Sequence, residues 1–164
     1  MRLLANASGL FHYKESESCG EVVYMRKIRQ FGEEYTVEEF VKKEILSNRG
    51  TQCVAFKEDM AWVCKKRNIT LTGKETKERM YELLIDAGCT SQMLAEEFGV
   101  GVSSQVYQHE FGITHQGVKR IEKSGKIRKV GSYRFRAYGK YLYAPLYDVY
   151  QFATITDDEI QELI

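Results

Sequence analysis

The sequence has a single proline, Pro145, and no apolar run long enough to cross a membrane. It therefore has no proline-rich linker that would mark a border between domains. The apolar stretch within residues 1–6 is too short for a secretory signal peptide. These absences lead us to expect a cytoplasmic protein without a membrane-spanning helix.

Motifs for metal binding and catalysis are equally scarce. A zinc site or redox pair needs close cysteine or histidine spacing, which is missing among Cys19, Cys53, Cys64, Cys89, His12, His109 and His115. A nuclease needs clustered carboxylates for metal ions or a histidine-based pair. The acidic candidates lie beside expected helix ends, where surface carboxylates are common: Glu96, Glu97, Asp157 and Asp158. We expect reduced thiols, no metal, no cofactor and no enzymatic activity.

What the sequence does contain favours a folded chain with one strongly basic segment. Hydrophobic residues make up 43% and charged residues 29% of the 164 residues, so a core can form in one domain or two small ones. Residues 113–143 contain nine lysines and arginines against Glu122 alone, a net charge of +8. Since the whole chain has a formal net charge of +1, the remainder carries −7. This asymmetry indicates either a polyanion-binding end or a solvated basic face without a partner.

The N-terminal region, residues 1–58, is expected to be a small α+β segment. Residues 21–28 have a strand-like composition, and residues 10–13 are the expected partner strand across a polar loop. Thr36 and Glu39 have the spacing of a capping box, so a helix is expected to start there and to end at residues 48–50. A short strand is expected within residues 51–56.

Residues 59–89 predict two helices, at about 60–67 and 74–87, joined by a turn. The spacing of Lys77, Met80 and Leu84 resembles the SAP and HeH class of small DNA-binding motifs. Gly73 departs from that pattern, because it lies four residues before the lysine rather than next to it. An ordinary helical hairpin fits the same residues. The resemblance implies a secondary DNA contact through Lys65, Lys66, Arg67, Lys74 and Lys77.

Three short helices are expected between residues 90 and 125, at 92–98, 105–111 and 115–123. Together they would form a compact trihelical unit. Each is preceded by residues that commonly cap helix N-termini: Thr90 or Ser91, Ser103 or Ser104, and Thr114. Each is followed by a glycine that can end it: Gly99, Gly112 and Gly125.

Two helix-turn-helix registers compete in this unit. The recognition helix is either the one after Gly99 or the one after Gly112. A recognition helix lies in the major groove between the two phosphate backbones, so its flanks should be basic. The helix after Gly99 contains no lysine or arginine, whereas the helix after Gly112 contains Lys119, Arg120 and Lys123. We therefore favour the second register.

A basic β-wing is expected after that helix. Strands are expected at 127–130, 133–138 and 141–144, with turns at 131–132 and 139–140. Alternation along the middle strand would put Arg134 and Arg136 on one face and Tyr133 and Phe135 on the other. We expect the aromatic side chains to form the packed face of the wing. The alternative is that they stack on the bases of single strands.

The order of elements over residues 90–152 is similar to that of winged helices in phage and bacterial regulators, including the MerR and excisionase-like group. The resemblance implies transcription regulation by a phage-like or mobile-element-like DNA-binding protein. Residues 153–164 are expected to form a capped acidic helix that either packs back on the core or dimerises. The expected fold class is α+β: a mixed N-terminal segment, a helical hairpin, and a trihelical helix-turn-helix with a small antiparallel wing.

We therefore expect a sequence-specific protein that binds double-stranded DNA. Thr114, His115, Gln116 and Lys119 would read base edges at the N-terminal end of the recognition helix. Basic side chains would hold the phosphates: Lys119, Arg120, Lys123, Lys126, Arg128, Lys129, Arg134, Arg136 and Lys140. The acidic N-terminal region would supply a homodimer contact or bind a protein partner. The alternative function is an inhibitor or adaptor of a nucleic-acid-processing complex that docks through the winged helix.

Overall fold

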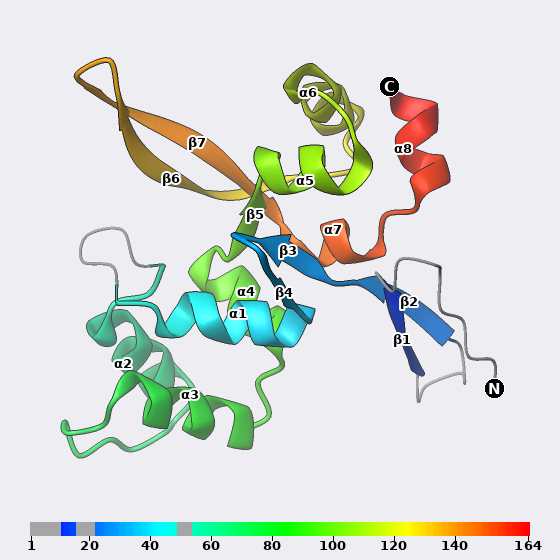
Figure 1. Ribbon diagram of the computed structural model, residues 1–164. Helices are drawn as coiled ribbons and strands as arrows, with labels where there is room; N and C mark the ends of the chain where they lie inside the picture. Colours follow the sequence, from blue (N-terminus) through cyan, green and yellow to red (C-terminus); the bar gives the residue numbers. More distant parts are fainter. Residues whose placement is uncertain (1–10, 16–21, 49–53) are drawn as a thin grey trace. The chain divides into compact units, whose positions relative to one another are not determined.

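The computed structural model describes residues 11–15, 22–48 and 54–164, with side chains described from Met25 onward. It shows an α+β protein with eight helices and small antiparallel sheets in the described residues, as the sequence predicts (Figure 1). The chain divides into two compact units, Met1–Val37 with Gly101–Ile164, and Glu38–Val100. Within the described ranges, no helix is both long and apolar enough to span a bilayer.

The unit Glu38–Val100 is helical. Its helices are α1 (Val37–Leu46), α2 (Lys57–Lys66), α3 (Lys77–Asp86) and α4 (Ser91–Phe98). Their apolar faces form a core that includes the fully buried Phe40, Ile45, Met60 and Leu84. The predicted helices are confirmed in this unit, with shifts of a few residues at their ends.

The shifted start of α3 has a local cause. The Glu75 carboxylate accepts the backbone N–H groups of Thr72 at 2.8 Å and Gly73 at 3.0 Å, which holds the chain in a turn. Thr76 then caps the helix by accepting the N–H of Arg79 at 3.1 Å. The helix therefore begins at Lys77 instead of the predicted residue 74. The predicted strand at 51–56 lies partly outside the described residues, and residues 54–56 form no strand because Phe56 is already the N-cap of α2.

Two small hairpins open the other unit. Strand β1 (Phe11–Glu15) pairs antiparallel with β2 (Val22–Arg26), which confirms the predicted pairing within the described residues. Strand β3 (Ile28–Gln30) pairs with β4 (Glu33–Tyr35), a hairpin that the sequence reasoning did not predict. Its two turn residues, Phe31 and Gly32, have φ angles of 53° and 76°. Positive φ at both positions is typical of a type I′ hairpin turn.

The rest of this unit combines two helices with a three-stranded sheet. The helices are α5 (Ser104–Phe111) and α6 (His115–Ser124). The strands are β5 (Gly101–Ser103), β6 (Lys129–Ala137) and β7 (Lys140–Asp148), in the order β5-β7-β6. Gly101 is required at the root of this sheet, since a Cβ there would lie 2.6 Å from the carbonyl oxygen of Tyr147.

The β6–β7 hairpin corrects the predicted strand pattern. The predicted turn at 131–132 is wrong, because β6 continues through it with a bulge between Lys129 and Gly131. The second predicted turn, at 139–140, is found one residue earlier, at Tyr138-Gly139, where both φ angles are positive, at 53° and 72°. The third strand of the sheet is β5, which pairs with β7 and which the sequence does not predict. Figure 1 shows the long hairpin projecting away from α5 and α6.

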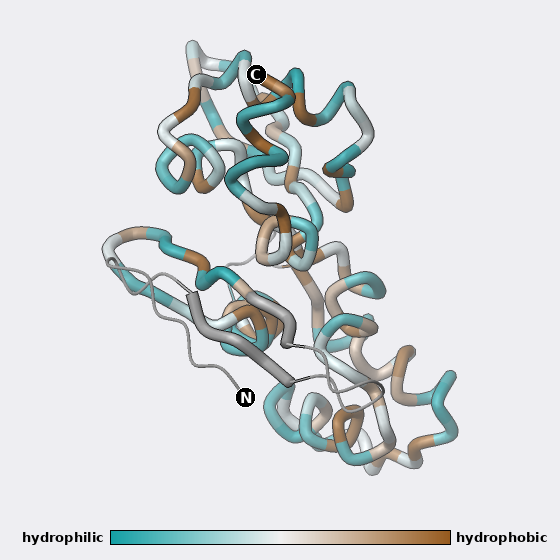
Figure 2. The backbone as a smooth tube through the Cα atoms, turned by 90° about the vertical axis from the view of Figure 1, so that its right-hand side faces the viewer, coloured by the Kyte–Doolittle hydropathy of each residue, from teal (hydrophilic) through white to brown (hydrophobic). Residues whose placement is uncertain are grey.

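Helices α7 (Val149–Thr154) and α8 (Asp157–Leu163) close the chain. The predicted acidic helix is thus confirmed, and it packs against α6 with Ile160 fully buried. Its sequence is hydrophilic with apolar residues at intervals, as Figure 2 shows near the C terminus. The core of the unit surrounds the ring of Tyr107. This ring makes edge-to-face contacts with the rings of Tyr147 and Phe152, with centroid-to-centroid distances of 5.8 and 4.9 Å.

A buried arginine ties the elements of this unit together. Arg26, only 1% exposed, donates to the backbone oxygens of Phe152 and Ile155 at 3.2 and 2.7 Å. It also forms ion pairs with Glu110 of α5 at 3.4 Å and Asp157 of α8 at 3.3 Å. Burial raises the pKa of the Glu110 carboxyl, and the nearby Arg26 charge opposes that rise. This network positions α5, and through it α6.

Candidate nucleic-acid interface

Helix α6 is held in place from one side and at both ends. Val118 and Ile121 are fully buried, and the Thr114 hydroxyl accepts the backbone N–H of Gly117 at 3.2 Å. Gly125 ends the helix with φ of 86°, in the left-handed conformation that favours glycine. The opposite face of a helix with this packing must be turned to solvent.

The exposed face of α6 carries the predicted contact residues. Residues three and four apart lie on the same side of a helix. All members of the set are exposed, and they cover one continuous side of α6: His115, Gln116, Lys119, Arg120 and Lys123. Within the described part of the chain, the three cations form no ion pair. The structure therefore brings together the residues that the sequence reasoning selected for base and phosphate contacts.

The N-terminal end of α6 is linked to the start of α5. The His115 Nδ1 atom lies 3.0 Å from the Ser104 hydroxyl, which also accepts from the Gln108 amide at 3.0 Å. These contacts fix the orientation of the His115 ring. Thr114 has a structural role as the helix cap, but its hydroxyl keeps a hydrogen that it can donate.

The single acid of α6 faces the hairpin. Glu122 accepts a hydrogen bond from the Tyr147 hydroxyl at 2.8 Å and pairs with Lys129 at 3.4 Å. Burial alone would raise the pKa of Glu122, but the Tyr147 hydroxyl and the Lys129 charge outweigh it, so the pKa lies below its ordinary value. The negative charge is thereby neutralised on the side of the helix that meets the sheet.

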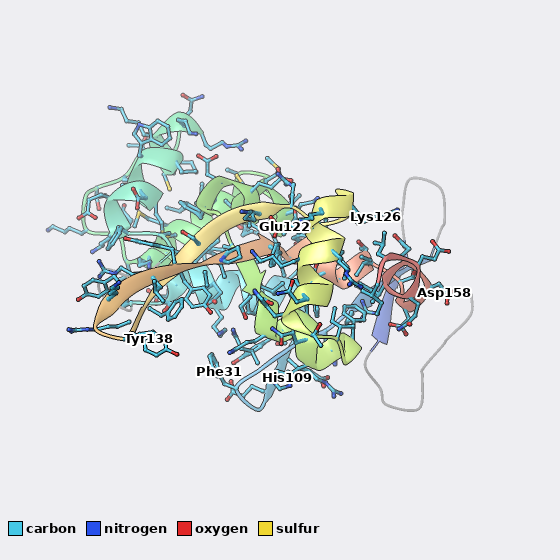
Figure 3. The ribbon with its side chains drawn as sticks, turned by 90° about the horizontal axis from the view of Figure 1, so that it is seen from above. Phe31, His109, Glu122, Lys126, Tyr138 and Asp158 are labelled. Carbon is cyan, nitrogen blue, oxygen red and sulfur yellow. The ribbon has the colours of Figure 1, made fainter. Side chains whose placement is uncertain are left out.

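Three predicted phosphate contacts are engaged in ion pairs. Lys129 pairs with Glu122, Arg128 pairs with Asp148 at 2.9 Å, and Lys126 pairs with Glu159 of α8 at 3.4 Å. Figure 3 looks onto α6, with Tyr138 at the far end of the hairpin on one side and Asp158 of α8 on the other. Among the described residues, the exposed cations that form no ion pair therefore include the three on α6: Lys119, Arg120 and Lys123.

The distal hairpin has two different faces. Residues paired across an antiparallel ladder share a face, and here Arg136 pairs with Tyr141 and Arg134 with Tyr143. We call these four residues the arginine–tyrosine face. The guanidinium of Arg134 lies 4.5 Å from the centroid of the Tyr141 ring, within the range of a cation–π contact. The other face pairs Phe135 with Leu142 and Tyr133 with Ala144.

The aromatic residues of the hairpin are exposed on both faces. Tyr133 and Phe135 are 37% and 38% exposed, Tyr141 and Tyr143 are 58% and 69% exposed, and Tyr138 at the turn is 97% exposed. The prediction that the aromatics form a packed face is therefore wrong. The physical reason is that the β6–β7 strands extend beyond the core of their own unit, away from α5 and α6 (Figure 1).

The secondary set in the helical unit is only partly at the surface. Lys77 is buried, and its ammonium donates to the backbone oxygens of Ser47 at 2.9 Å and Ala55 at 2.6 Å. The predicted DNA contact through Lys77 is therefore wrong, because this ammonium is already satisfied inside the fold. Lys66 pairs with Glu97 at 2.6 Å and lies over the Trp62 ring. The remaining members of the set are exposed: Lys65, Arg67 and Lys74.

The site holds no arrangement typical of a metal centre. Among the described residues, no group of three or more histidine, cysteine, aspartate or glutamate side chains converges on one point. Cys64 and Cys89 are buried free thiols, and burial raises the pKa of Cys64. No family model, curated protein or solved structure matches this chain.

Proposed function

We propose that this protein binds double-stranded DNA in a sequence-specific manner, with α6 as the recognition helix in the major groove. The observation that carries this proposal is the exposed face of α6. Three cations that form no ion pair with any described residue lie there beside Gln116 and His115, while the opposite face is buried in the core. Cations can bind the phosphates on either side of a groove, and glutamine can pair with adenine through two hydrogen bonds.

The neighbouring elements support a winged helix-turn-helix arrangement. Helices α5 and α6 are joined by the short link Gly112–Thr114, which is typical of a helix-turn-helix. The β6–β7 hairpin follows α6 directly, and β5 ahead of α5 joins the same sheet. The hairpin would then act as a wing that contacts the DNA backbone beside the groove, through Arg134, Arg136 and Lys140. This arrangement best suits a regulator of transcription.

The experiment that tests the proposal is fluorescence anisotropy with random-sequence duplex DNA, single-stranded DNA and duplex RNA at two salt concentrations. The expected result is duplex DNA binding that weakens steeply with salt, because binding releases counterions from the phosphates. Lys119→Ala/Lys123→Ala should weaken it further. Selection from a randomised duplex library should then yield a common sequence. Absence of binding to duplex DNA at low salt would refute the proposal.

A second candidate function is supported by the apolar face of the hairpin. Phe135 and Leu142 are paired there and remain 38% and 39% exposed, as is suitable for docking on a protein. In that case the protein would be an inhibitor or adaptor of a nucleic-acid-processing complex. Phe135→Ala/Leu142→Ala would then abolish binding to, and inhibition of, the nucleic-acid-processing complex. Binding of isolated duplex DNA would be weak or absent in the wild type.

A further inference from the structure

The arginine–tyrosine face differs from α6 in the kind of group that accompanies the charge. On α6 the cations stand beside polar side chains that suit hydrogen bonds to base edges. On the hairpin the cations stand beside Tyr141 and Tyr143, whose rings are 58% and 69% exposed. Cross-strand pairing accounts for their position opposite Arg136 and Arg134, but not for the large exposed area that remains.

The turn of the hairpin adds a second, independent observation. Tyr138 has φ of 53°, a left-handed conformation that is unfavourable for a bulky side chain and that asparagine or glycine adopts readily. Its side chain is 97% exposed, so packing against the described residues does not offset this strain. Backbone strain at such a position often belongs to a functional site.

The charge around these rings fits a polyanion. Residues 130–147 contain Arg134, Arg136 and Lys140 and no aspartate or glutamate. Arg134 lies 4.5 Å from the centroid of Tyr141 and Arg136 lies 5.7 Å from it, so one ring has two guanidinium groups beside it. Cations combined with exposed aromatic rings form the stacking platforms that bind single-stranded nucleic acid.

Stacking on these rings requires unpaired bases, since the bases of an intact duplex are already stacked on one another. We propose that the arginine–tyrosine face, together with Tyr138, binds unpaired bases next to the duplex that α6 holds. The preferred ligand is then a DNA duplex that continues into a single-stranded tail. This inference rests on the proposed function, because α6 supplies the duplex contact.

The test compares three DNA ligands with the same duplex. One is blunt, one carries a tail of about eight thymidines, and one carries a tail of equal length built from abasic sugar-phosphate units. The abasic tail adds the same phosphates without bases, so it separates stacking from charge. Affinities are measured by anisotropy for the full chain and for Tyr141→Ala/Tyr143→Ala. Tyr133→Ala, on the other face of the hairpin, is the matched control, and Tyr141→Phe keeps the ring.

The expected result is that the thymidine tail raises affinity about tenfold over the blunt duplex, the gain that stacking of one or two bases supplies. The abasic tail gives a much smaller gain. The double tyrosine variant loses the gain but binds the blunt duplex as the wild type does, while Tyr133→Ala and Tyr141→Phe keep it.

Two results would overturn the inference while leaving the proposed function intact. One is an equal gain from the thymidine and abasic tails, and the other is an unchanged gain in the double tyrosine variant. Failure of the wild type to bind the blunt duplex would instead refute the proposed function, and this inference with it.

Discussion

Helix α6 and the distal β6–β7 hairpin are both strongly basic, but they are supported in different ways. Helix α6 is capped by Thr114 and buries Val118 and Ile121 completely. The distal hairpin exposes aromatic side chains on both faces. The comparison teaches that positive charge alone does not define a binding mode. A rigid helix can read a fixed groove, whereas a hairpin with exposed rings suits a flexible ligand.

The largest expected effect concerns the difference in packing between α6 and the distal hairpin. Ile121→Ala should lower the free energy of unfolding by about 2–5 kcal/mol, since it leaves a cavity beneath α6. Leu142→Ala, a matched apolar truncation on the exposed hairpin, should cost less than about 1 kcal/mol. Urea unfolding followed by circular dichroism measures both. Equal costs for the two variants would show that the hairpin is as well packed as the helix.

The root of the hairpin should be sensitive even though its tip is not. Gly101→Ala should cost about 1–3 kcal/mol, because the new methyl group would meet the Tyr147 carbonyl oxygen at 2.6 Å and force β5 away from β7. Thermal unfolding gives the change. An alanine at the exposed Gly131 of β6 is the control and should cost less. A stability equal to that of the wild type would mean that β5 and β7 are not paired as described.

Base reading should belong to α6 and not to the hairpin. Gln116→Ala should weaken binding to a selected duplex by about 1–3 kcal/mol and leave random duplex nearly unchanged, since only a base contact is lost. Arg136→Ala should weaken both duplexes by a similar, smaller factor, as loss of a phosphate contact does. Competition anisotropy with the two duplexes measures the ratio. A loss of selectivity in Arg136→Ala alone would reverse this assignment.

The smallest expected effect concerns the contact between α6 and the sheet. Glu122 has a pKa below its ordinary value of 4.5 in the folded chain, so its ionised form stabilises the fold at neutral pH. This contribution is present above about 4.5 and is lost as the pH falls through the lower, folded pKa. Glu122→Gln should therefore flatten the acid side of the curve of unfolding free energy against pH. An unchanged acid limb in urea melts would show that Glu122 is not held by Tyr147 and Lys129.

Much of α6 and its neighbours could be predicted because the signals are local. Capping threonines and terminal glycines act within one helical turn, so Thr90, Gly99, Thr114 and Gly125 are recognisable without knowledge of the fold. The exposed face of α6 follows from spacing alone, since Val118 and Ile121 are the apolar residues of an otherwise polar helix.

The features that could not be predicted depend on contacts distant in sequence. Gly131-Ser132 predicts a turn because Gly-Ser is a common turn pair, but β6 pairs with β7 through these residues, with a bulge between Lys129 and Gly131. The sequence predicts Lys77 as a surface cation, but the carbonyls of Ser47 and Ala55 bind it inside the fold. Tyr141 and Tyr143 are exposed because the hairpin extends beyond the core of its unit. The length of that extension is not encoded in any local sequence pattern.

The most direct test of the central claim is the salt dependence of duplex binding in two matched double variants. Lys119→Ala/Lys123→Ala removes two cations from α6, and Lys65→Ala/Arg67→Ala removes two from the helical unit. If α6 lies in the groove, the first variant should bind at least about tenfold more weakly and lower the slope of log K against log salt by about two, while the second behaves as the wild type. An unchanged slope in the α6 variant, or the larger loss in the Lys65/Arg67 variant, would contradict the account.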